Sequence, residues 1–270
     1  MNLEEQFQKS RRKIQLLRGT VTGVDIIPNE QVKDVPLLLV SGWGETLDTT
    51  KSIVLSLART GRRVLALESH HLDTIVKNSE QFPQQGYVKA LVLLEFLNTQ
   101  KIEKVDVIAH SQGAINAVIA AWVKPNVFNT LILVGPAGML NKDEFLNLAG
   151  RFSSHLFYHF LFHSGQKINF SIQYIIQVFI YIFSNPLQAL QEAVGMVNFH
   201  IAQMVRSLQK NNMKIHVVHD EDDVVFPFNE VKKTVHELGI ENFHSMKGWH
   251  NFIHEQPEKS AQFFATILNT

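Results

Sequence analysis

The segment Val105-Asp-Val-Ile-Ala-His-Ser-Gln-Gly-Ala114 decides the interpretation of this chain. A short apolar run ends at Ala109-His-Ser-Gln-Gly113, and a helical pattern starts directly after it. This order predicts a strand, a sharp turn that carries Ser111, and a helix, as in a G-x-S-x-G turn whose first glycine is alanine. Such a turn exposes the serine hydroxyl, so Ser111 is a candidate nucleophile. The alternative is that Ser111 only caps the helix that follows a buried strand.

The composition limits the class of protein. Of the 270 residues, 45% are hydrophobic and 19% are charged, which allows a sizeable core. A formal net charge of zero removes the electrostatic argument for a nucleic-acid partner. The chain has no cysteine, which excludes disulfides, thiolate chemistry and cysteine zinc sites, and fits a reducing cytoplasm. We therefore expect a cytoplasmic globular protein.

Neither the N-terminus nor the longest apolar stretch indicates insertion into a membrane. The first residues lack the apolar region of a secretory signal. The stretch Phe170 to Phe183 is too short and too polar for a comfortable transmembrane helix, so we expect a buried helix there. Residues 1–18 are predicted to be a polar lead-in. Its basic cluster, Lys9, Arg11, Arg12 and Lys13, gives weak support for peripheral membrane contact.

Apolar runs alternate with helical patterns along most of the chain. Such alternation indicates an α/β fold with a mostly parallel, doubly wound sheet that helices cover on both faces. Residues 140–208 contain no convincing strand and are rich in aromatic and aliphatic residues, which predicts a helical insertion. We therefore expect a core domain over residues 1–139 and 209–270 and a helical cap over residues 140–208.

A serine alcohol needs a positioned base, and that base needs a carboxylate to orient it. In a doubly wound sheet these groups belong on loops at the carboxyl ends of later strands. Two loops are suitable: His219-Asp-Glu-Asp-Asp-Val-Val-Phe-Pro227 and Lys247-Gly-Trp-His-Asn-Phe-Ile-His254. The candidate groups therefore follow one another along the chain as serine, aspartate and histidine.

This order and these loops resemble the α/β-hydrolase superfamily, from roughly Pro36 to the end of the chain, with the insertion in the place of a cap. The resemblance implies a serine hydrolase. The acid loop of that superfamily commonly has the form G-x-x-D followed by apolar residues and a proline. Counting back from Pro227 favours Asp223 as the acid, with Asp222 next, and Asp220 or Glu221 after that.

The base is expected at His250, which directly follows a predicted strand. Its loop, Gly248-Trp-His250 with Gln256-Pro-Glu258 beyond it, resembles the terminal G-H loop of the superfamily. His254 is the competitor, with the alternative that it is a helix-surface residue near Glu258. His110, beside the nucleophile, is expected to pack or to line the pocket, pointing away from the serine proton.

An oxyanion hole needs two backbone N–H groups aimed at the developing negative charge. We expect one from Gln112, directly after the nucleophile and at a helix N-terminus. By the position it holds in the resemblance, Trp43 in Ser41-Gly-Trp-Gly44 is expected to supply the other. Ser41 departs from the histidine that is common there. The alternative for this segment is a turn with a packed indole.

No metal or other cofactor is expected. The segment Glu68-Ser-His-His-Leu-Asp73 carries two histidines and two acids, but no third ligand at a suitable spacing is evident. We expect hydrolysis of a small, lipophilic carboxylic ester through an acyl-enzyme on Ser111. Thioesterase, lysophospholipase, lactone or carbon–carbon hydrolase, lyase and acyltransferase reactions use the same groups. A non-catalytic binding protein is the alternative from another class, and the sequence does not indicate an oligomeric state.

Overall fold

The computed structural model describes residues 2–68, 83–140, 144–162 and 166–269. Over these residues, eight strands form one sheet in the order β1-β2-β4-β3-β5-β6-β7-β8. β1 and β2 pair as an antiparallel hairpin and β2 is antiparallel to β4, whereas the remaining neighbours are parallel. The predicted α/β class with a mostly parallel sheet is confirmed. The strands are β1 (Arg12–Leu16), β2 (Gly19–Ile26), β3 (Lys33–Val40), β4 (Arg62–Glu68), β5 (Val105–His110), β6 (Phe128–Val134), β7 (Lys214–Asp220) and β8 (Phe243–Met246).

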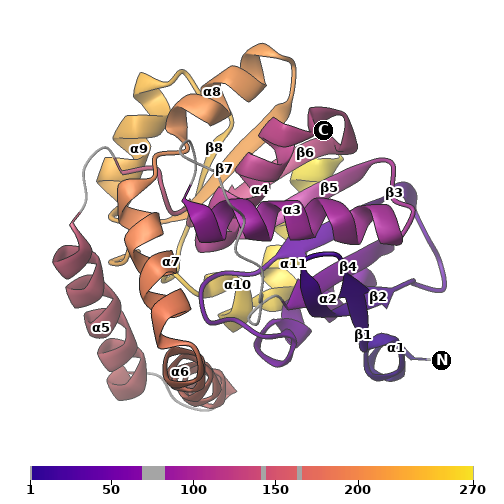
Figure 1. Cartoon of the computed structure of the whole chain (residues 1–270), viewed down its shortest axis with the longest axis horizontal. Helices are drawn as coiled ribbons and strands as arrows, with labels where there is room; N and C mark the ends of the chain where they lie inside the picture. The colour runs from indigo at the N-terminus through magenta and orange to yellow at the C-terminus, as the bar shows by residue number, and fades with distance from the viewer. Residues whose placement is uncertain (1, 69–82, 141–143, 163–165, 270) are drawn as a thin grey trace.

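Helices cover both faces of this sheet, as the apolar strands require (Figure 1). The central strand β3 is buried on both faces because side chains alternate along it: Leu38 and Val40 pack into one core cluster, Leu37 and Leu39 into the other. The first cluster includes residues of α3, α4, α8 and α9, and the second includes α1, α2, α10 and α11. The helices are α1 (Leu3–Ser10), α2 (Leu47–Arg59), α3 (Gln84–Thr99), α4 (Gln112–Val123), α5 (Phe145–Phe162), α6 (Gln166–Ser184), α7 (Pro186–Asn198), α8 (Ala202–Lys210), α9 (Phe228–Glu237), α10 (Phe252–Glu255) and α11 (Pro257–Leu268).

The N-terminal segment is more ordered than the sequence pattern suggests. The expected polar lead-in is folded into α1 and β1, and the side chain of Phe7 is fully buried. Two apolar residues, Leu3 and Phe7, on a short polar helix are a weak periodic signal, so only packing against the sheet domain reveals their role.

Four helices, α5 to α8, lie between β6 and β7, where the sequence predicts an insertion. α8 packs on α4 and β7, and its Val205 and Leu208 lie in the same core cluster as the sheet. Figure 1 shows α5 and α6 at one side of the molecule, away from the N-terminus. None of the described helices is long and apolar enough to cross a membrane. The predicted division into core and cap domains stays a prediction.

The junction between β5 and α4 depends on close contact with β3. At Gly113, an added Cβ atom would lie 2.5 Å from the carbonyl oxygen of Val40 and 2.7 Å from that of Ser41. Both distances are far below van der Waals contact, and backbone oxygens cannot swing aside as a long side chain can. The start of α4 can therefore approach the end of β3 only if this position is glycine.

We expect Gly113→Ala to lower the free energy of unfolding by about 1–3 kcal/mol, because the new methyl group overlaps with the β3 backbone. Gly150→Ala is the matched control, since nothing lies within 4 Å of a Cβ atom added on α5. That control should raise stability by about 0.5–1 kcal/mol through helix propensity. Urea unfolding of both variants measures the difference, and an equal effect would contradict close packing at Gly113.

Candidate active site

Ser111 occupies the turn between β5 and α4 in a rare backbone conformation. Its φ is 53° and its ψ is −121°, and its side chain makes no capping hydrogen bond with α4. Its N–H donates to the carbonyl of Val134 at 2.9 Å, and its own carbonyl accepts from Ala137 at 3.2 Å. A positive φ at a residue other than glycine costs about 1–3 kcal/mol and persists where the surrounding structure holds it. Ser111 thus holds the N-cap position of α4 without capping it through its side chain, which disfavours the helix-cap alternative.

The structure brings Ser111, His250 and Asp223 into one hydrogen-bonded chain. The Oγ atom of Ser111 lies 2.9 Å from Nε2 of His250, and Nδ1 of His250 lies 2.7 Å from Oδ2 of Asp223. Since a carboxylate only accepts, Nδ1 of His250 donates to it and Nε2 is left to accept from the serine hydroxyl. This is the arrangement in which a histidine can remove the serine proton.

Asp223 is held as a buried anion. Its Oδ1 accepts hydrogen bonds from the backbone N–H groups of Val225 at 2.7 Å and Phe226 at 3.0 Å. Burial opposes ionisation, but the charge and hydrogen bond of His250 outweigh it and lower the pKa of Asp223 to about 2. Of the competing acids, Asp222 is exposed and Glu221 accepts from Ser245 instead. Only Asp223 in this loop bonds His250.

Asp220, the third competitor, is buried without a partner. Both of its carboxyl oxygens are buried, and neither has a hydrogen-bond partner among the described residues. Burial, followed by the nearby charge of Asp223, raises the pKa of Asp220 to about 10. Asp220 is therefore a neutral acid at physiological pH, and its proton prevents a second buried anion beside Asp223.

Glu45, a residue that the sequence interpretation missed, is a buried carboxylate that bonds His110 and His254. Oε1 of Glu45 accepts from Nδ1 of His110 at 2.6 Å and from Nε2 of His254 at 2.9 Å, and Oε2 accepts from the N–H of Gly42 at 2.7 Å. The alternative of His254 as a helix-surface residue is wrong, because its side chain is 1% exposed. Nothing in the local pattern marks Glu45, since its side-chain partners His110 and His254 lie on β5 and α10, far away in the sequence.

The bonds of His110 define its charge. Nδ1 bonds the Glu45 carboxylate, and Nε2 bonds the carbonyl oxygen of His250 at 2.9 Å. Both acceptors lack a proton, so both ring nitrogens must donate and the ring is cationic. Burial lowers the pKa of His110, but the charge of Glu45 outweighs it and the net shift is upward. Burial likewise opposes ionisation of Glu45, but His110 and His254 hold its pKa well below the ordinary value.

Glu45, His110 and His254 also form a set of potential metal ligands. Their contacts of 2.6 and 2.9 Å are hydrogen bonds between the same atoms that would bind an ion. The arrangement fits a buried ion pair that connects the Gly42 loop, the nucleophile turn and the backbone of His250. The other metal candidate, Glu68 to Asp73, lies mostly in residues 69–82, outside the described residues.

The two predicted oxyanion donors lie on either side of the nucleophile. Gln112 begins α4, and Trp43 lies in the loop after β3 beside the cavity that Ser111 lines. Among the described residues, no backbone acceptor is found for the N–H of Trp43 or of Gln112. The carbonyl of Trp43 accepts from the Tyr174 hydroxyl of α6 at 3.4 Å, so a cap helix supports this loop. The roles of Trp43 and Gln112 stay predictions.

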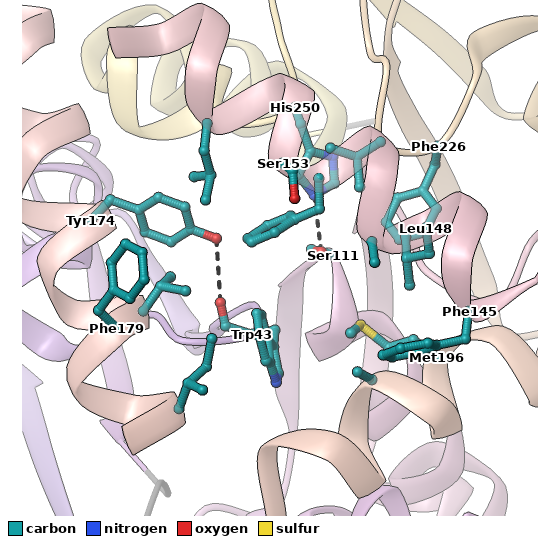
Figure 2. A pocket seen from close by; sticks show the side chains of 17 residues that line it. Trp43, Ser111, Phe145, Leu148, Ser153, Tyr174, Phe179, Met196, Phe226 and His250 are labelled. Carbon is teal, nitrogen blue, oxygen red and sulfur yellow. Dashed lines mark hydrogen bonds between the residues drawn. The ribbon is translucent and has the colours of Figure 1, made fainter. Parts of the chain in front are cut away.

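Ser111 and His250 lie at the edge of an apolar cavity of about 290 Å³. Figure 2 shows them together with side chains of the cap and of the Trp43 loop. No residue of this lining carries a formal charge at neutral pH, apart from the titratable His250. The indole of Trp43 packs edge-on against Phe152 and Tyr181, so it is both a packed residue and part of the wall. The cap contribution includes Phe145, Leu148, Phe152, Tyr174, Val178, Phe179 and Met196.

A buried ion pair connects α7 of the helical insertion to α3, and Gln112 at the start of α4 bonds both partners. Nζ of Lys89 on α3 lies 2.8 Å from Oε1 of Glu192 on α7, and both side chains are almost fully buried. Burial raises the pKa of Glu192, but Lys89 outweighs it and the net shift is downward. The side chain of Gln112 donates to Glu192 and accepts from Lys89, each at 3.3 Å. This network fixes α7 over the start of α4.

We expect Asp220→Asn to raise the free energy of unfolding, by an amount that grows from pH 5 to pH 8. In the unfolded chain this carboxyl ionises near pH 3.8, whereas the folded protein keeps it protonated up to about 10. The wild type therefore loses stability as pH rises through this range, at up to about 1.4 kcal/mol per pH unit, and an amide does not. Asp222→Asn is the exposed control. Urea unfolding at several pH values is the measurement, and a pH-independent difference would contradict the neutral Asp220.

Comparisons with known proteins extend this picture. No protein-family model matches the sequence, and none of the curated proteins is similar enough to match. Solved structures do match over nearly the whole chain. A carboxylesterase of the thaumarchaeon Nitrososphaera gargenis is 18% identical, with a TM-score of 0.72 and coverage of 96% of this chain and 98% of that chain.

Two further structures have the same architecture. An alpha/beta hydrolase from a sediment metagenome of the Mar Chica lagoon is 15% identical, with a TM-score of 0.64 and coverage of 96% of this chain and 98% of that chain. The meta-cleavage product hydrolase of Pseudomonas fluorescens IP01 is 15% identical, with a TM-score of 0.69 and coverage of 97% and 98%. At these identities the likeness concerns the fold alone. The chain therefore has the α/β-hydrolase fold.

Proposed function

We propose that this protein is a serine hydrolase that cleaves a carboxylic ester through an acyl-enzyme on Ser111. The observation that carries the proposal is the continuous chain from Ser111 Oγ through His250 to Asp223, at the edge of an apolar cavity. A non-catalytic binding protein would have no need for a strained serine that is bonded to a histidine and a buried carboxylate. The backbone strain at Ser111 therefore favours catalysis over binding alone.

The mechanism follows from these contacts. His250 Nε2 takes the hydroxyl proton while Ser111 Oγ attacks the acyl carbon. Asp223 keeps the other ring proton on Nδ1 and stabilises the imidazolium that forms. The imidazolium then gives its proton to the departing alcohol. The acyl group remains bound to Ser111 Oγ as an ester. Water attacks this ester with His250 again as the base, and the acid product leaves.

The oxyanion of both tetrahedral intermediates needs donors. We assign this role to the backbone N–H groups of Trp43 and Gln112. Among the described residues neither N–H has a backbone acceptor, and Gln112 lies at the N-terminus of α4. Glu45 bonds the N–H of Gly42, next to Trp43, which orients the loop that carries one donor. No cofactor enters this mechanism.

The cavity favours an apolar acyl or alkyl group. Its lining is aromatic and aliphatic, which suits a hydrocarbon chain and disfavours a charged one. Thioesters, lactones, lysophospholipids and carbon–carbon bonds react by the same groups, and transfer to an alcohol instead of water uses the same acyl-enzyme. A simple ester needs nothing beyond the groups described. We also propose a cytoplasmic location, on the absence of cysteine alone.

We expect a fluorophosphonate probe to label the wild type and not Ser111→Ala, which should also lose at least about 10⁴-fold in kcat on a p-nitrophenyl acyl ester. Asp223→Asn should lose about 10³–10⁴-fold because the histidine tautomer is no longer held. Asp222→Asn, an exposed neighbour, is the matched control and should keep full activity. Labelling of Ser111→Ala, or a wild type that is neither labelled nor active, would refute the proposal; equal losses in the two asparagine variants would refute the role of Asp223.

We expect kcat/KM to rise with acyl chain length in a series of p-nitrophenyl esters. Each methylene that enters the cavity contributes about 0.8 kcal/mol, which corresponds to up to about fourfold per carbon. The cavity of about 290 Å³ lies at the small end of the usual range of about 300–1,000 Å³, so the rise should stop at medium chains. Steady-state kinetics of the series is the measurement, and a flat profile would contradict an apolar acyl site.

A further inference from the structure

Helix α6 is apolar on two faces, one toward the protein and one toward solvent. Tyr174, Val178 and Tyr181 are buried at spacings of four and three residues. A second stripe with helical spacing lies on the outer face. Its members and their exposed fractions are Ile172 (38%), Ile176 (49%), Phe179 (52%), Ile180 (52%) and Phe183 (79%). The expectation of a buried helix in this stretch is wrong for the outer face.

Helix α7, which packs on α6, also carries exposed apolar side chains. There, Leu187, Leu190 and Val194 are exposed by 68%, 50% and 37%, again at helical spacing. We call these eight residues of α6 and α7 the apolar cap surface. Exposed large apolar residues elsewhere, such as Leu17 and Val32, lie outside the cap. Exposed apolar residues gathered on two helices that pack on each other are typical of an interaction site.

The apolar cap surface is also uncharged. From Ile172 to Asn198, Glu192 is the only charged residue in the sequence, and it is buried in its ion pair with Lys89. Its polar neighbours are glutamines, such as Gln173 and Gln177. Charge pairing with an acidic or basic partner is therefore not available here, and apolar burial must supply the attraction.

This surface reaches the candidate active site. Phe179 belongs to the stripe and also lines the cavity that holds Ser111, and Phe145, which is 39% exposed, lines the cavity as well (Figure 2). Phe179 is therefore in contact with both the cavity and the solvent. A hydrocarbon chain that passes from outside to Ser111 along Phe179 stays in contact with apolar groups.

These observations decide between possible occupants. A second copy of the chain seated on this surface would cover Phe179, where the cavity comes to the outside, and would obstruct entry of substrate. A lipid surface would cover the same side chains and supply a substrate with an acyl chain. The basic segment near Arg11 is a poorer membrane contact, because Arg11 pairs with Asp48 and this end of the chain lies on the other side of the molecule (Figure 1).

We propose that the apolar cap surface docks on a lipid–water interface of neutral headgroups and that the substrate is an acyl ester drawn from it. The substrate part of this inference rests on the proposed serine hydrolase; the docking part does not. The outer side chains insert among the acyl chains, as in an interfacial helix that lies in the membrane plane. Because the surface is uncharged, binding requires no anionic lipid and is insensitive to salt.

The test is sedimentation of the full chain with phosphatidylcholine vesicles. Wild type should sediment with them, and Phe183→Ser/Leu187→Ser should bind at least about tenfold more weakly, since two large apolar side chains no longer insert. Leu17→Ser/Val32→Ser removes comparably exposed apolar side chains outside the cap and should bind like wild type. Phe183 and Leu187 do not line the cavity, so hydrolysis of a soluble short-chain ester should stay unchanged, which also verifies folding.

Several outcomes would overturn the docking site: no sedimentation of wild type, equal binding by the cap variant, or equal loss in the control variant. Binding that needs phosphatidylserine and disappears at high salt would assign membrane contact to the basic segment instead. A wild-type dimer that the cap variant abolishes, without vesicle binding, would assign the surface to a second copy. If wild type binds vesicles but hydrolyses no soluble ester, docking stands and the proposed hydrolase fails.

Discussion

The close approach of α4 to the end of β3 is the constraint on which the site depends. Only a glycine at position 113 lets the helix start within contact of the Val40 and Ser41 carbonyls, because any Cβ atom would overlap with them. This approach brings the turn of Ser111 beside the loop of Gly42 and Trp43, and Ser111 and Trp43 line the same cavity. The backbone strain at Ser111 is the energetic cost of that geometry, and its bonds to Val134 and Ala137 hold it in place.

Around this turn lie three buried acids, of which two are ionised and one keeps its proton. Asp223 is an anion because His250 and two backbone N–H groups face it; Glu45 is an anion because His110 faces it. Asp220 has no such partner and keeps its proton. Burial opposes ionisation at all three, so the hydrogen-bond partners determine the difference. The result is one negative charge on Asp223, bonded to His250, and one on Glu45, bonded to His110. Asp220 adds no third negative charge.

The cap combines two tasks in a single layer of helices. Its inner side chains line the cavity and support the Trp43 loop. The Lys89–Glu192 pair joins α7 to α3, and Gln112 links this pair to the start of α4. The outer side chains of the cap on α6 and α7 remain apolar although the sheet domain does not need them for its core. Hydropathy alone cannot separate these tasks, because α6 places apolar side chains both toward the cavity and toward the solvent.

Much of the fold follows from local pattern. Alternating apolar strands and helices predict the parallel sheet, and Ala109 to Gly113 predicts the turn, since period and small residues are properties of neighbouring positions. The place of His250 after a strand, and the spacing of Asp223 from Pro227 within the resemblance, also indicate the two side chains that the structure joins to Ser111 by hydrogen bonds. Glu45, buried His254 and protonated Asp220 were not indicated in this way, because each depends on groups that only chain topology brings near. The sequence by itself thus determined the parallel sheet and the order of serine, acid and histidine along the chain. The tertiary structure decided which buried acids are ionised and which side chains they bond, because burial and hydrogen-bond partners come from segments that are distant in the sequence.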